Sequence, residues 1–163
     1  MELGKGQEAA KPLLKKGLKI LPQDFKTLDV LVNNAGIFYD SWQKATDADF
    51  KVVREALETN TLGAWRMCQA FIPLLKASGH GRIVNVSSEA GSMANMGGGT
   101  PAYNVSKVAM NASTRMLASE LKRSRILMNS ACPGWVATEM GWRRRPSGER
   151  WCGRYCVGCH FAR

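Results

Sequence analysis

Three short runs of β-branched and aliphatic residues divide this chain, and their spacing constrains the fold more than any other feature. The runs cover residues 29–32, 82–86 and 126–131, and each is followed by residues typical of turns. Long segments with helical periodicity separate them, and a strand, a helix and another strand in succession are typical of a parallel crossover. The sequence therefore predicts an α/β protein with a parallel sheet.

Two long helices are predicted between these strands. The first covers 46–78, begins at the capping-box-like pair Thr46 and Asp49, and ends at residues 79–81. Its apolar positions recur at helical spacing: Phe50, Val53, Leu57, Ala64, Met67, Phe71, Leu74 and Leu75. The second helix covers 102–122 and follows a glycine-rich loop. Both segments are long enough to connect parallel strands.

Polar and turn residues follow each predicted strand at the same end of the sheet. They are Asn33 and Asn34, Ser87 and Ser88, and Pro133 and Gly134. In open parallel sheets, ligands bind outside the carboxyl ends of the strands. We therefore expect a binding site at this edge of the sheet, formed by residues from three separate segments.

Tyr103 and Lys107 place a phenol and an ammonium four residues apart at the start of a predicted helix. At this spacing the two side chains emerge on one face, one turn apart. A nearby cation favours the phenolate, which predicts a Tyr103 pKa below the ordinary value of about 10. An ordinary helix surface also carries such pairs. Together with Ser88 and Asn60, however, the pair indicates carbonyl reduction, with Tyr103 as the proton donor.

Composition narrows the class of protein further. A length of 163 residues with 45% apolar content suits one globular domain, and no apolar stretch is long enough to predict a membrane span. No signal peptide is visible, and five scattered cysteines do not suggest a secreted disulfide framework, so we expect a cytoplasmic protein. Half of the net charge of +10 falls in residues 142–163, without a recognition motif, so neither a nucleic-acid nor a membrane partner is expected.

Five motifs in a fixed order carry a family resemblance. They are residues 29–36 ending in Asn-Asn-Ala-Gly, Asn60 with Gly63, residues 81–88 ending in Ser-Ser, Tyr103 with Lys107, and Cys132-Pro133-Gly134-Trp135-Val136 with Thr138. This combination resembles the short-chain dehydrogenase/reductase family and, within it, the carbonyl-reductase-like members. The resemblance covers residues 18–141. It implies a partial Rossmann-like, doubly wound parallel sheet and a nicotinamide cofactor.

The resemblance also implies a role for individual residues. The catalytic residues it implies are Asn60, Ser88, Tyr103 and Lys107. The cofactor-binding residues are Asn34, Ala35, Gly36, Tyr103, Lys107, Pro133, Gly134, Val136 and Thr138. Trp135 is expected to face the substrate, or alternatively to fill the core. The cofactor is expected to be NADPH, a preference that rests on the subfamily alone.

Two parts of the family pattern are missing. The first strands and the glycine-rich turn that holds the pyrophosphate are not found, so residues 1–141 are expected to form an incomplete Rossmann-like reductase domain. From Trp142 onward the resemblance stops. Residues 142–163 are rich in Arg, Gly, Cys and Trp and show no amphipathic period, which predicts a disordered tail produced by a frameshift or altered splice.

Three functions follow from these observations. The first is an NADPH-dependent oxidoreductase that reduces an aldehyde or ketone and has no metal site. The second is a catalytically inactive, truncated homologue that acts through pairing, as a homodimer or with a full-length relative. The two long helices form dimer contacts in many members of the family. The third is a metal-binding module in the tail, formed by Cys152, Cys156, Cys159 and His160, with zinc the favoured ion.

Overall fold

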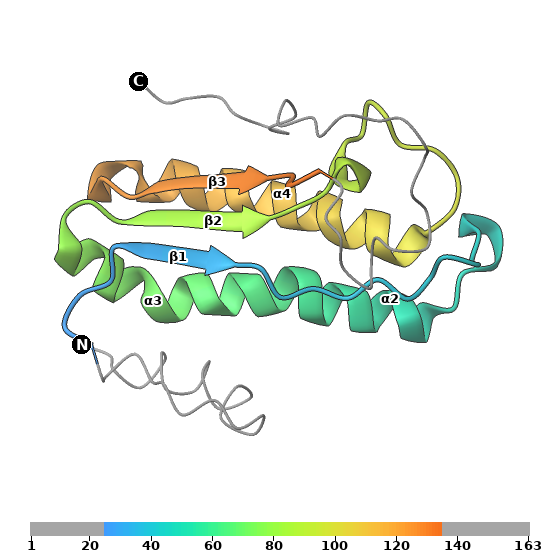
Figure 1. Cartoon of the computed structure of the whole chain (residues 1–163), viewed down its shortest axis with the longest axis horizontal. Helices are drawn as coiled ribbons and strands as arrows, with labels where there is room; N and C mark the ends of the chain where they lie inside the picture. Colours follow the sequence, from blue (N-terminus) through green and yellow to red (C-terminus); the bar gives the residue numbers. More distant parts are fainter. Residues whose placement is uncertain (1–24, 135–163) are drawn as a thin grey trace.

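A three-stranded parallel sheet forms the centre of the protein. The computed structural model describes residues 25–134. The strands are β1 (Val30–Asn33), β2 (Arg82–Val86) and β3 (Leu127–Ala131), in the order β1-β2-β3 (Figure 1). Ile83 lies opposite Leu31 on one side and opposite Met128 on the other. The predicted α/β architecture with a parallel sheet is therefore confirmed.

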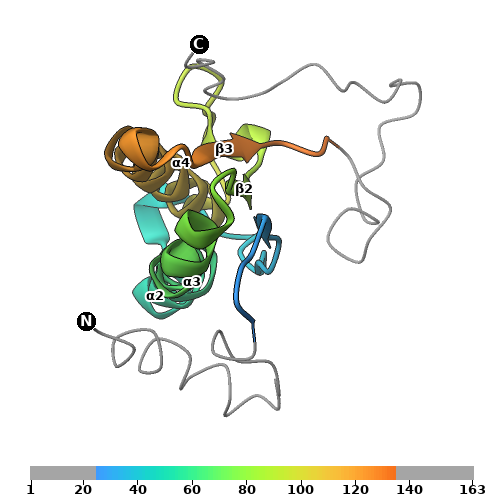
Figure 2. The same cartoon turned by 90° about the vertical axis from the view of Figure 1, so that its left-hand side faces the viewer.

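Two crossovers connect the strands, and their helices lie on one face of the sheet (Figure 2). The first crossover contains α2 (Phe50–Ala56), the π-helical segment η3 (Leu57–Gly63) and α3 (Ala64–Ser78), and the second contains α4 (Pro101–Leu121). Short 3-10 turns occur at η2 (Ala45–Asp47), η4 (Glu89–Gly91) and η5 (Lys122–Ser124).

The ends of the first crossover differ in part from the prediction. Helix α2 begins after Asp49, whose carboxylate accepts a hydrogen bond from the Lys51 amide, so the predicted start at Thr46 is wrong. Thr46 lies instead in η2, before the helix. At the other end, Gly79 adopts a left-handed conformation with φ of 76° and ends α3 where the sequence predicted.

The hydrophobic core lies between the sheet and the helices. Its buried members come from all three strands and from α3 and α4: Leu31, Cys68, Leu75, Ile83, Leu117, Leu121, Ile126 and Met128. Cys68 is fully buried, as expected for a cysteine that serves as a small apolar residue. Burial raises the pKa of its thiol to about 11, which makes it an unreactive cysteine. Phe50, by contrast, is 69% exposed, so the predicted apolar stripe does not include the first residue of α2.

The opposite face of the sheet is apolar as well. Val30, Val32 and Leu127 point to this face and are 51%, 55% and 46% exposed. Parallel sheets usually carry apolar residues on both faces because helices cover both. Between residues 25 and 134, helices cover only the face that packs against α3 and α4 (Figure 2).

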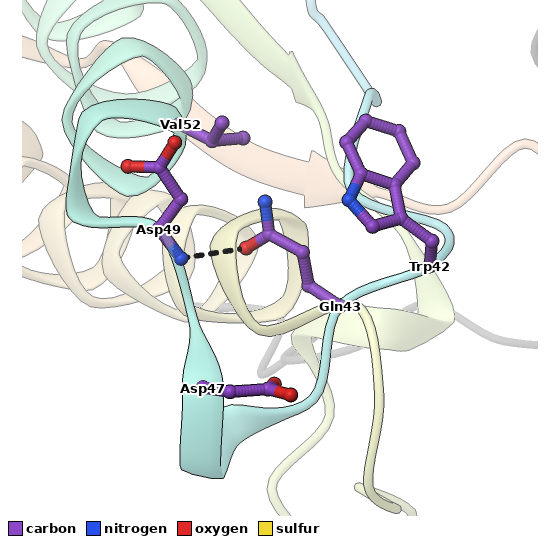
Figure 3. Close-up of a pocket in the computed structure, with 5 residues that line it drawn as sticks. All are labelled: Trp42, Gln43, Asp47, Asp49 and Val52. Atoms are coloured by element: carbon purple, nitrogen blue, oxygen red, sulfur yellow. Dashed lines mark hydrogen bonds between the residues drawn. The ribbon is translucent and has the colours of Figure 1, made fainter.

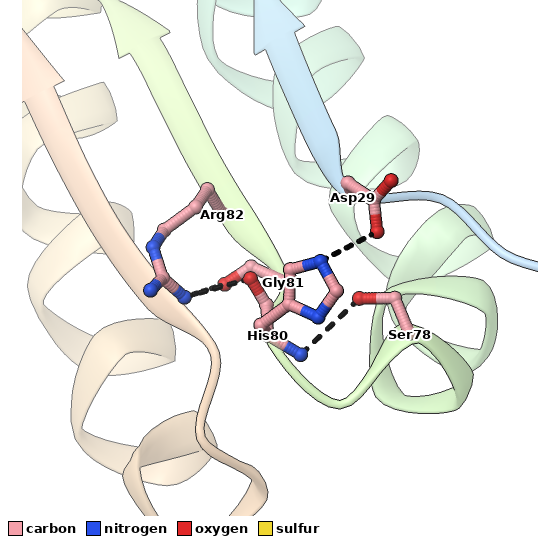
Figure 4. Close-up of polar contacts among 5 residues, drawn as sticks. All are labelled: Asp29, Ser78, His80, Gly81 and Arg82. Carbon is pink, nitrogen blue, oxygen red and sulfur yellow. Dashed lines mark hydrogen bonds and ion pairs between the residues drawn. The ribbon is translucent and has the colours of Figure 1, made fainter.

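The turn between α3 and β2 lies at the amino ends of the strands (Figure 4), and it packs Gly81 against Leu75 near the end of α3. A Cβ at Gly81 would lie 2.8 Å from the carbonyl oxygen of Leu75, so only glycine fits there without a shift. Nearby, His80 Nε2 lies 3.1 Å from Asp29 Oδ1, and both side chains are exposed. This polar cluster lies at the end of the sheet opposite to the predicted site.

Several predictions concern residues outside the described range. The prediction about the first strands and the glycine-rich turn concerns residues 1–24, and the predictions of a disordered tail and of metal ligands concern residues 142–163. Within residues 25–134, no group of cysteine, histidine and carboxylate side chains could hold a metal ion. In the same part of the chain, no helix has the length and apolar character needed to cross a membrane.

Candidate active site

The candidate site lies at the carboxyl ends of the strands, where α4 begins. Tyr103 and Lys107 occupy the first two turns of α4, and their spacing puts both side chains on the face toward the sheet. The Lys107 ammonium donates a hydrogen bond to the carbonyl oxygen of Val86, the last residue of β2, at 2.8 Å. Its Nζ lies 5.5 Å from the centre of the Tyr103 ring. The structure therefore holds the pair against the end of the central strand.

Burial sets the pKa of Tyr103. The phenol is largely removed from water, which raises its pKa above 10; a hydrogen bond with Ser88 acts in the opposite direction and is the weaker effect. An electrostatic interaction with Cys132 contributes a further increase to the Tyr103 pKa. The prediction that the Lys107 ammonium lowers the Tyr103 pKa is therefore wrong. Desolvation of the phenol is the largest effect on this pKa, and the hydroxyl keeps its proton at neutral pH.

Lys107 is shifted in the opposite direction. Burial lowers the pKa of its ammonium to about 8, and an electrostatic interaction with Cys132 opposes this shift. Only 4% of the residue is exposed. Tyr103 and Lys107 thus lose water together, and their two pKa values move apart, upward for the phenol and downward for the ammonium.

Ser88, rather than Ser87, lies beside the phenol. Ser88 Oγ accepts a hydrogen bond from the Ala90 amide at 3.2 Å, which starts the η4 turn, and the same side chain hydrogen-bonds with Tyr103. Ser87 follows the alternation of β2, so it is buried. Its Oγ has no hydrogen-bond partner within residues 25–134. The two adjacent serines therefore occupy different environments.

Asn60 lies within the π-helical segment η3 and is fully buried. Its Oδ1 accepts a hydrogen bond from the Ile37 amide at 2.7 Å, and its Nδ2 donates to the Ile37 carbonyl at 3.0 Å. Nδ2 also donates to Ser106 Oγ at 2.9 Å, which links η3 to α4. Asn60 thereby fixes the loop after β1 against α4.

Gly36 brings this loop close to the lysine. A Cβ at Gly36 would lie 3.2 Å from Asn60 Oδ1 and 3.6 Å from Lys107 Nζ. Asn34 and Ala35 precede it and are exposed at the end of β1. The residues expected to bind the cofactor therefore line the same edge of the sheet as Lys107.

Asn33 has a different role from its neighbour. It was expected at the binding edge of the sheet together with Asn34, but its side chain is buried and donates to Asn85 Oδ1 at 2.8 Å. Asn85 in turn donates to Thr114 Oγ1 at 2.9 Å. This chain of hydrogen bonds joins β1, β2 and α4 through the interior. Asn33 therefore contributes to the packing of the fold, and of the two asparagines only Asn34 is exposed at the edge of the sheet.

The segment after β3 is described only in part. Pro133 and Gly134 are exposed beyond the end of β3, and Gly134 adopts a positive φ of 73°. Trp135, Val136 and Thr138, which were expected to contact the substrate and the cofactor, lie outside the described residues.

Three residues at the site were not found from the sequence. The Phe38 ring packs on the Tyr103 ring, with 4.7 Å between their centres. The Ser106 hydroxyl donates to the Tyr103 carbonyl at 2.8 Å. The third is Asp40, a fully buried carboxylate that contacts the start of α4. A buried aspartate has no sequence signal of its own, whereas Ser106 could have been found because it lies one turn beyond Tyr103.

A separate hollow of about 210 Å³ lies beside the loop before α2 (Figure 3). Trp42, Gln43, Asp47, Asp49 and Val52 line it. Two of these residues are joined by a hydrogen bond, which the Asp49 amide donates to Gln43 Oε1 at 3.1 Å. None of the predicted site residues lines this hollow, so it is distinct from the candidate site.

Comparison with known proteins identifies the family. Residues 9–148 match the model of the short chain dehydrogenase family. Over 115 residues the chain is 36% identical to the C-signal protein of Myxococcus xanthus, which covers 70% of the chain. The fold matches the carbonyl reductase Sniffer of D. melanogaster with a TM-score of 0.69 at 32% identity over 86% of the chain. It also matches an NADPH-bound carbonyl reductase from chicken fatty liver with a TM-score of 0.71 at 29% identity over 87% of the chain.

The chain therefore belongs to the short-chain dehydrogenase family. Within that family it is carbonyl-reductase-like, as its motifs indicated. The chain spans 69% of the length of the C-signal protein and 60% and 57% of the two reductase structures. It spans 59% of the length of the (+)-neomenthol dehydrogenase of Arabidopsis thaliana and 42% of that of the oxidoreductase UcpA of Salmonella typhimurium.

Proposed function

We propose that this chain is an oxidoreductase that uses NADPH to reduce an aldehyde or ketone. The observation that carries the proposal is the convergence of four side chains, Asn60, Ser88, Tyr103 and Lys107, from three separate segments on one edge of the sheet. Membership of the short-chain dehydrogenase family supports the same chemistry. The choice of NADPH rests on the similarity to the NADPH-bound reductase.

Tyr103 is the proton donor in this proposal. Its raised pKa keeps the phenol protonated at neutral pH, which is the form that can give a proton to a carbonyl oxygen. Ser88 hydrogen-bonds with the phenol, so its hydroxyl lies where it can also donate to that oxygen as negative charge develops. Lys107 and Asn60 hold the tyrosine and the loop after β1 in place.

The described residues fit a nicotinamide cofactor at the same edge. Gly36 approaches Lys107 so closely that a side chain there would meet its ammonium, and the exposed Asn34 and Ala35 leave the end of β1 open. In the proposed complex, Asn34, Ala35 and Gly36 line the adenosine side, and Tyr103 and Lys107 bind the nicotinamide ribose. Bound NADPH supplies the hydride that is added to the carbonyl carbon.

Cofactor titration tests this proposal. Quenching of tryptophan fluorescence by NADPH, saturating at roughly micromolar to millimolar concentration, is expected. A response to NADH of equal strength would remove the preference for NADPH. No response to either nucleotide at millimolar concentration would contradict the reductase proposal and favour the inactive homologue.

The second candidate function, pairing with another copy or with a full-length relative, is favoured by one observation. The solvent side of α4 carries Val105 and Met116, which are 47% and 49% exposed. Light scattering during size-exclusion chromatography would test it. A dimer that Met116→Lys converts to a monomer supports pairing through α4, and a monomer at all concentrations contradicts it.

A further inference from the structure

Helix α4 begins without the side-chain cap that helices usually carry. Thr100 occupies the N-cap position in a left-handed conformation with φ of 45°, and its side chain makes no capping hydrogen bond. Pro101 follows as the first helical residue and has no amide hydrogen. The first free donors of the helix are therefore the amides of Ala102 and Tyr103. Such donors require a partner when they are buried.

Asp40 supplies that partner from a distant part of the chain. Its Oδ2 accepts hydrogen bonds from the Ala102 amide at 2.7 Å and the Tyr103 amide at 3.3 Å. The residue is only 1% exposed. The ion pairs within residues 25–134 are Arg66–Glu58 and His80–Asp29, so no described cation balances this carboxylate. The partial positive charge at the start of α4 does so instead.

The same loop contacts the tyrosine in two further ways. The Asn60 side chain binds both the amide and the carbonyl of Ile37, and the Phe38 ring packs against the Tyr103 ring. Asp40 itself is held in a turn, where its carbonyl accepts a hydrogen bond from the Gln43 amide at 3.1 Å. On the other side of Tyr103, the Ser106 hydroxyl binds its carbonyl. Side-chain hydrogen bonds, added to the backbone bonds of the helix, thus hold Tyr103 at both its amide and its carbonyl.

We propose that Asp40 is a positioning residue for Tyr103: its buried carboxylate caps α4 and fixes where the phenol lies relative to Ser88 and Lys107. The proposal rests on the reductase function for its kinetic consequences. Asp40 touches neither the phenol nor any reacting atom, so it acts only through the backbone of Tyr103. Because α4 lacks its own cap, the start of this helix depends on the loop that follows β1.

Three variants separate positioning from a general effect on stability. Asp40→Ala removes the cap. Asp40→Asn keeps an acceptor oxygen, and Asn caps helices about as well as Asp. Asp49→Ala is the matched control, because Asp49 caps α2 in the same way but lies in an exposed position away from Tyr103.

Steady-state kinetics on the full chain give the first measurement. Asp40→Ala is expected to lower kcat by about tenfold to a hundredfold, as for a misplaced catalytic group, with little change in the KM for NADPH. Asp40→Asn is expected to restore most of the loss, and Asp49→Ala to leave kcat unchanged. Equal losses in Asp40→Ala and Asp49→Ala, or an unchanged kcat in Asp40→Ala, would overturn the proposal.

A second measurement does not depend on turnover, so it still decides the role of Asp40 if the reductase function fails. Ionisation of Tyr103 is followed by ultraviolet absorbance; the groups around the phenol are Ser88, Lys107 and Cys132, with Asp40 at its amide. In Asp40→Ala its pKa is expected to fall toward the ordinary value as water reaches the loosened turn, and to stay raised in Asp40→Asn. An unchanged pKa in Asp40→Ala would overturn the proposal.

Hydrogen exchange of the unmodified protein covers the case in which Asp40→Ala does not fold. The amides of Ala102 and Tyr103 are expected to be protected, although they lie in the first turn of a helix. Exchange at the rate of a free peptide would overturn the proposal.

Discussion

The Nζ of Lys107 lies 5.5 Å from the centre of the Tyr103 ring, and both groups are largely buried. Burial raises the phenol pKa and lowers the ammonium pKa to about 8, since each group is less stable in its charged form away from water. At neutral pH the pair therefore consists of a neutral phenol and an ammonium. This is the protonation state that a proton donor needs.

Replacing Tyr103 with phenylalanine removes the proposed proton donor and keeps the ring that packs on Phe38. Turnover of a carbonyl substrate is expected to fall at least about a hundredfold, while affinity for NADPH stays nearly unchanged. The loss of nicotinamide absorbance measures the rate. Tyr39→Phe is the matched control, because Tyr39 is an exposed tyrosine in the same loop as Phe38. Full turnover in Tyr103→Phe would contradict the assigned role.

The ionisation of Tyr103 tests the corrected direction of its pKa shift. The difference in ultraviolet absorbance between the unmodified protein and Tyr103→Phe reports this one phenol. The midpoint of its ionisation is expected to lie above the ordinary tyrosine pKa of about 10. A midpoint near pH 8 would show that the cation dominates after all.

Lys107 makes stability depend on pH. The unfolded chain holds the lysine proton up to about pH 10.5, and the folded protein only up to about pH 8. Above pH 8 the unfolded state therefore binds more protons, so the contribution of this group to stability rises with pH. Relative to Lys107→Met, the unmodified protein is expected to gain about 2 kcal/mol in unfolding free energy between about pH 8 and pH 10.

Urea denaturation of both proteins at several pH values gives this difference. The comparison stops near pH 10, because above that pH the unfolded chain loses the Tyr103 proton before the folded protein does, which changes stability with the opposite sign. A difference that does not vary with pH would mean that Lys107 has an ordinary pKa in the folded protein.

The two adjacent serines are expected to respond differently to alanine. Ser88→Ala removes the hydroxyl beside the phenol and is expected to reduce turnover about a hundredfold. Ser87→Ala removes a buried hydroxyl that has no partner within residues 25–134, so it should leave stability unchanged or raise it by about 1 kcal/mol. Kinetics and thermal unfolding of both variants check this, and a larger kinetic loss in Ser87→Ala would reverse the assignment.

Gly81 is expected to be intolerant of a side chain for steric reasons. A Cβ there would lie 2.8 Å from backbone oxygen and 2.9 Å from the Leu75 side chain, so Gly81→Ala should cost about 1–3 kcal/mol. Gly98→Ala is the control, because nothing lies within 4 Å of a Cβ at that position. Equal unfolding midpoints for the two variants would show that the turn adapts freely.

Much of this fold could be predicted because its elements are local. Strand β2 was predicted with its observed ends, since a β-branched run follows Gly81 and stops at two serines. The end of α3 followed from Gly79, which alone tolerates the left-handed conformation there. The choice of Ser88 over Ser87 followed from family spacing, and the structure places Ser88 beside Tyr103.

The remaining features depend on contacts between distant residues. The pKa of Tyr103 was predicted with the wrong sign, because a sequence shows the neighbouring cation but not how much water the fold removes. Asp40 was missed because its partners, the amides of Ala102 and Tyr103, lie 62 and 63 residues away. No pattern of residue types along the chain connects them.

The π-helical segment at Leu57–Gly63 has a consequence for the whole first crossover. A π turn holds more residues than the 3.6 of an α-helix, so each extra residue rotates everything beyond it by about 100°. The stripe that faces the sheet in α3 is consequently out of phase with α2, as the outward Phe50 shows. Deleting one residue from this segment would convert the π turn into regular α-helix. It would also rotate Asn60 away from Ile37, so that the loop that carries Asp40 would lose these two hydrogen bonds.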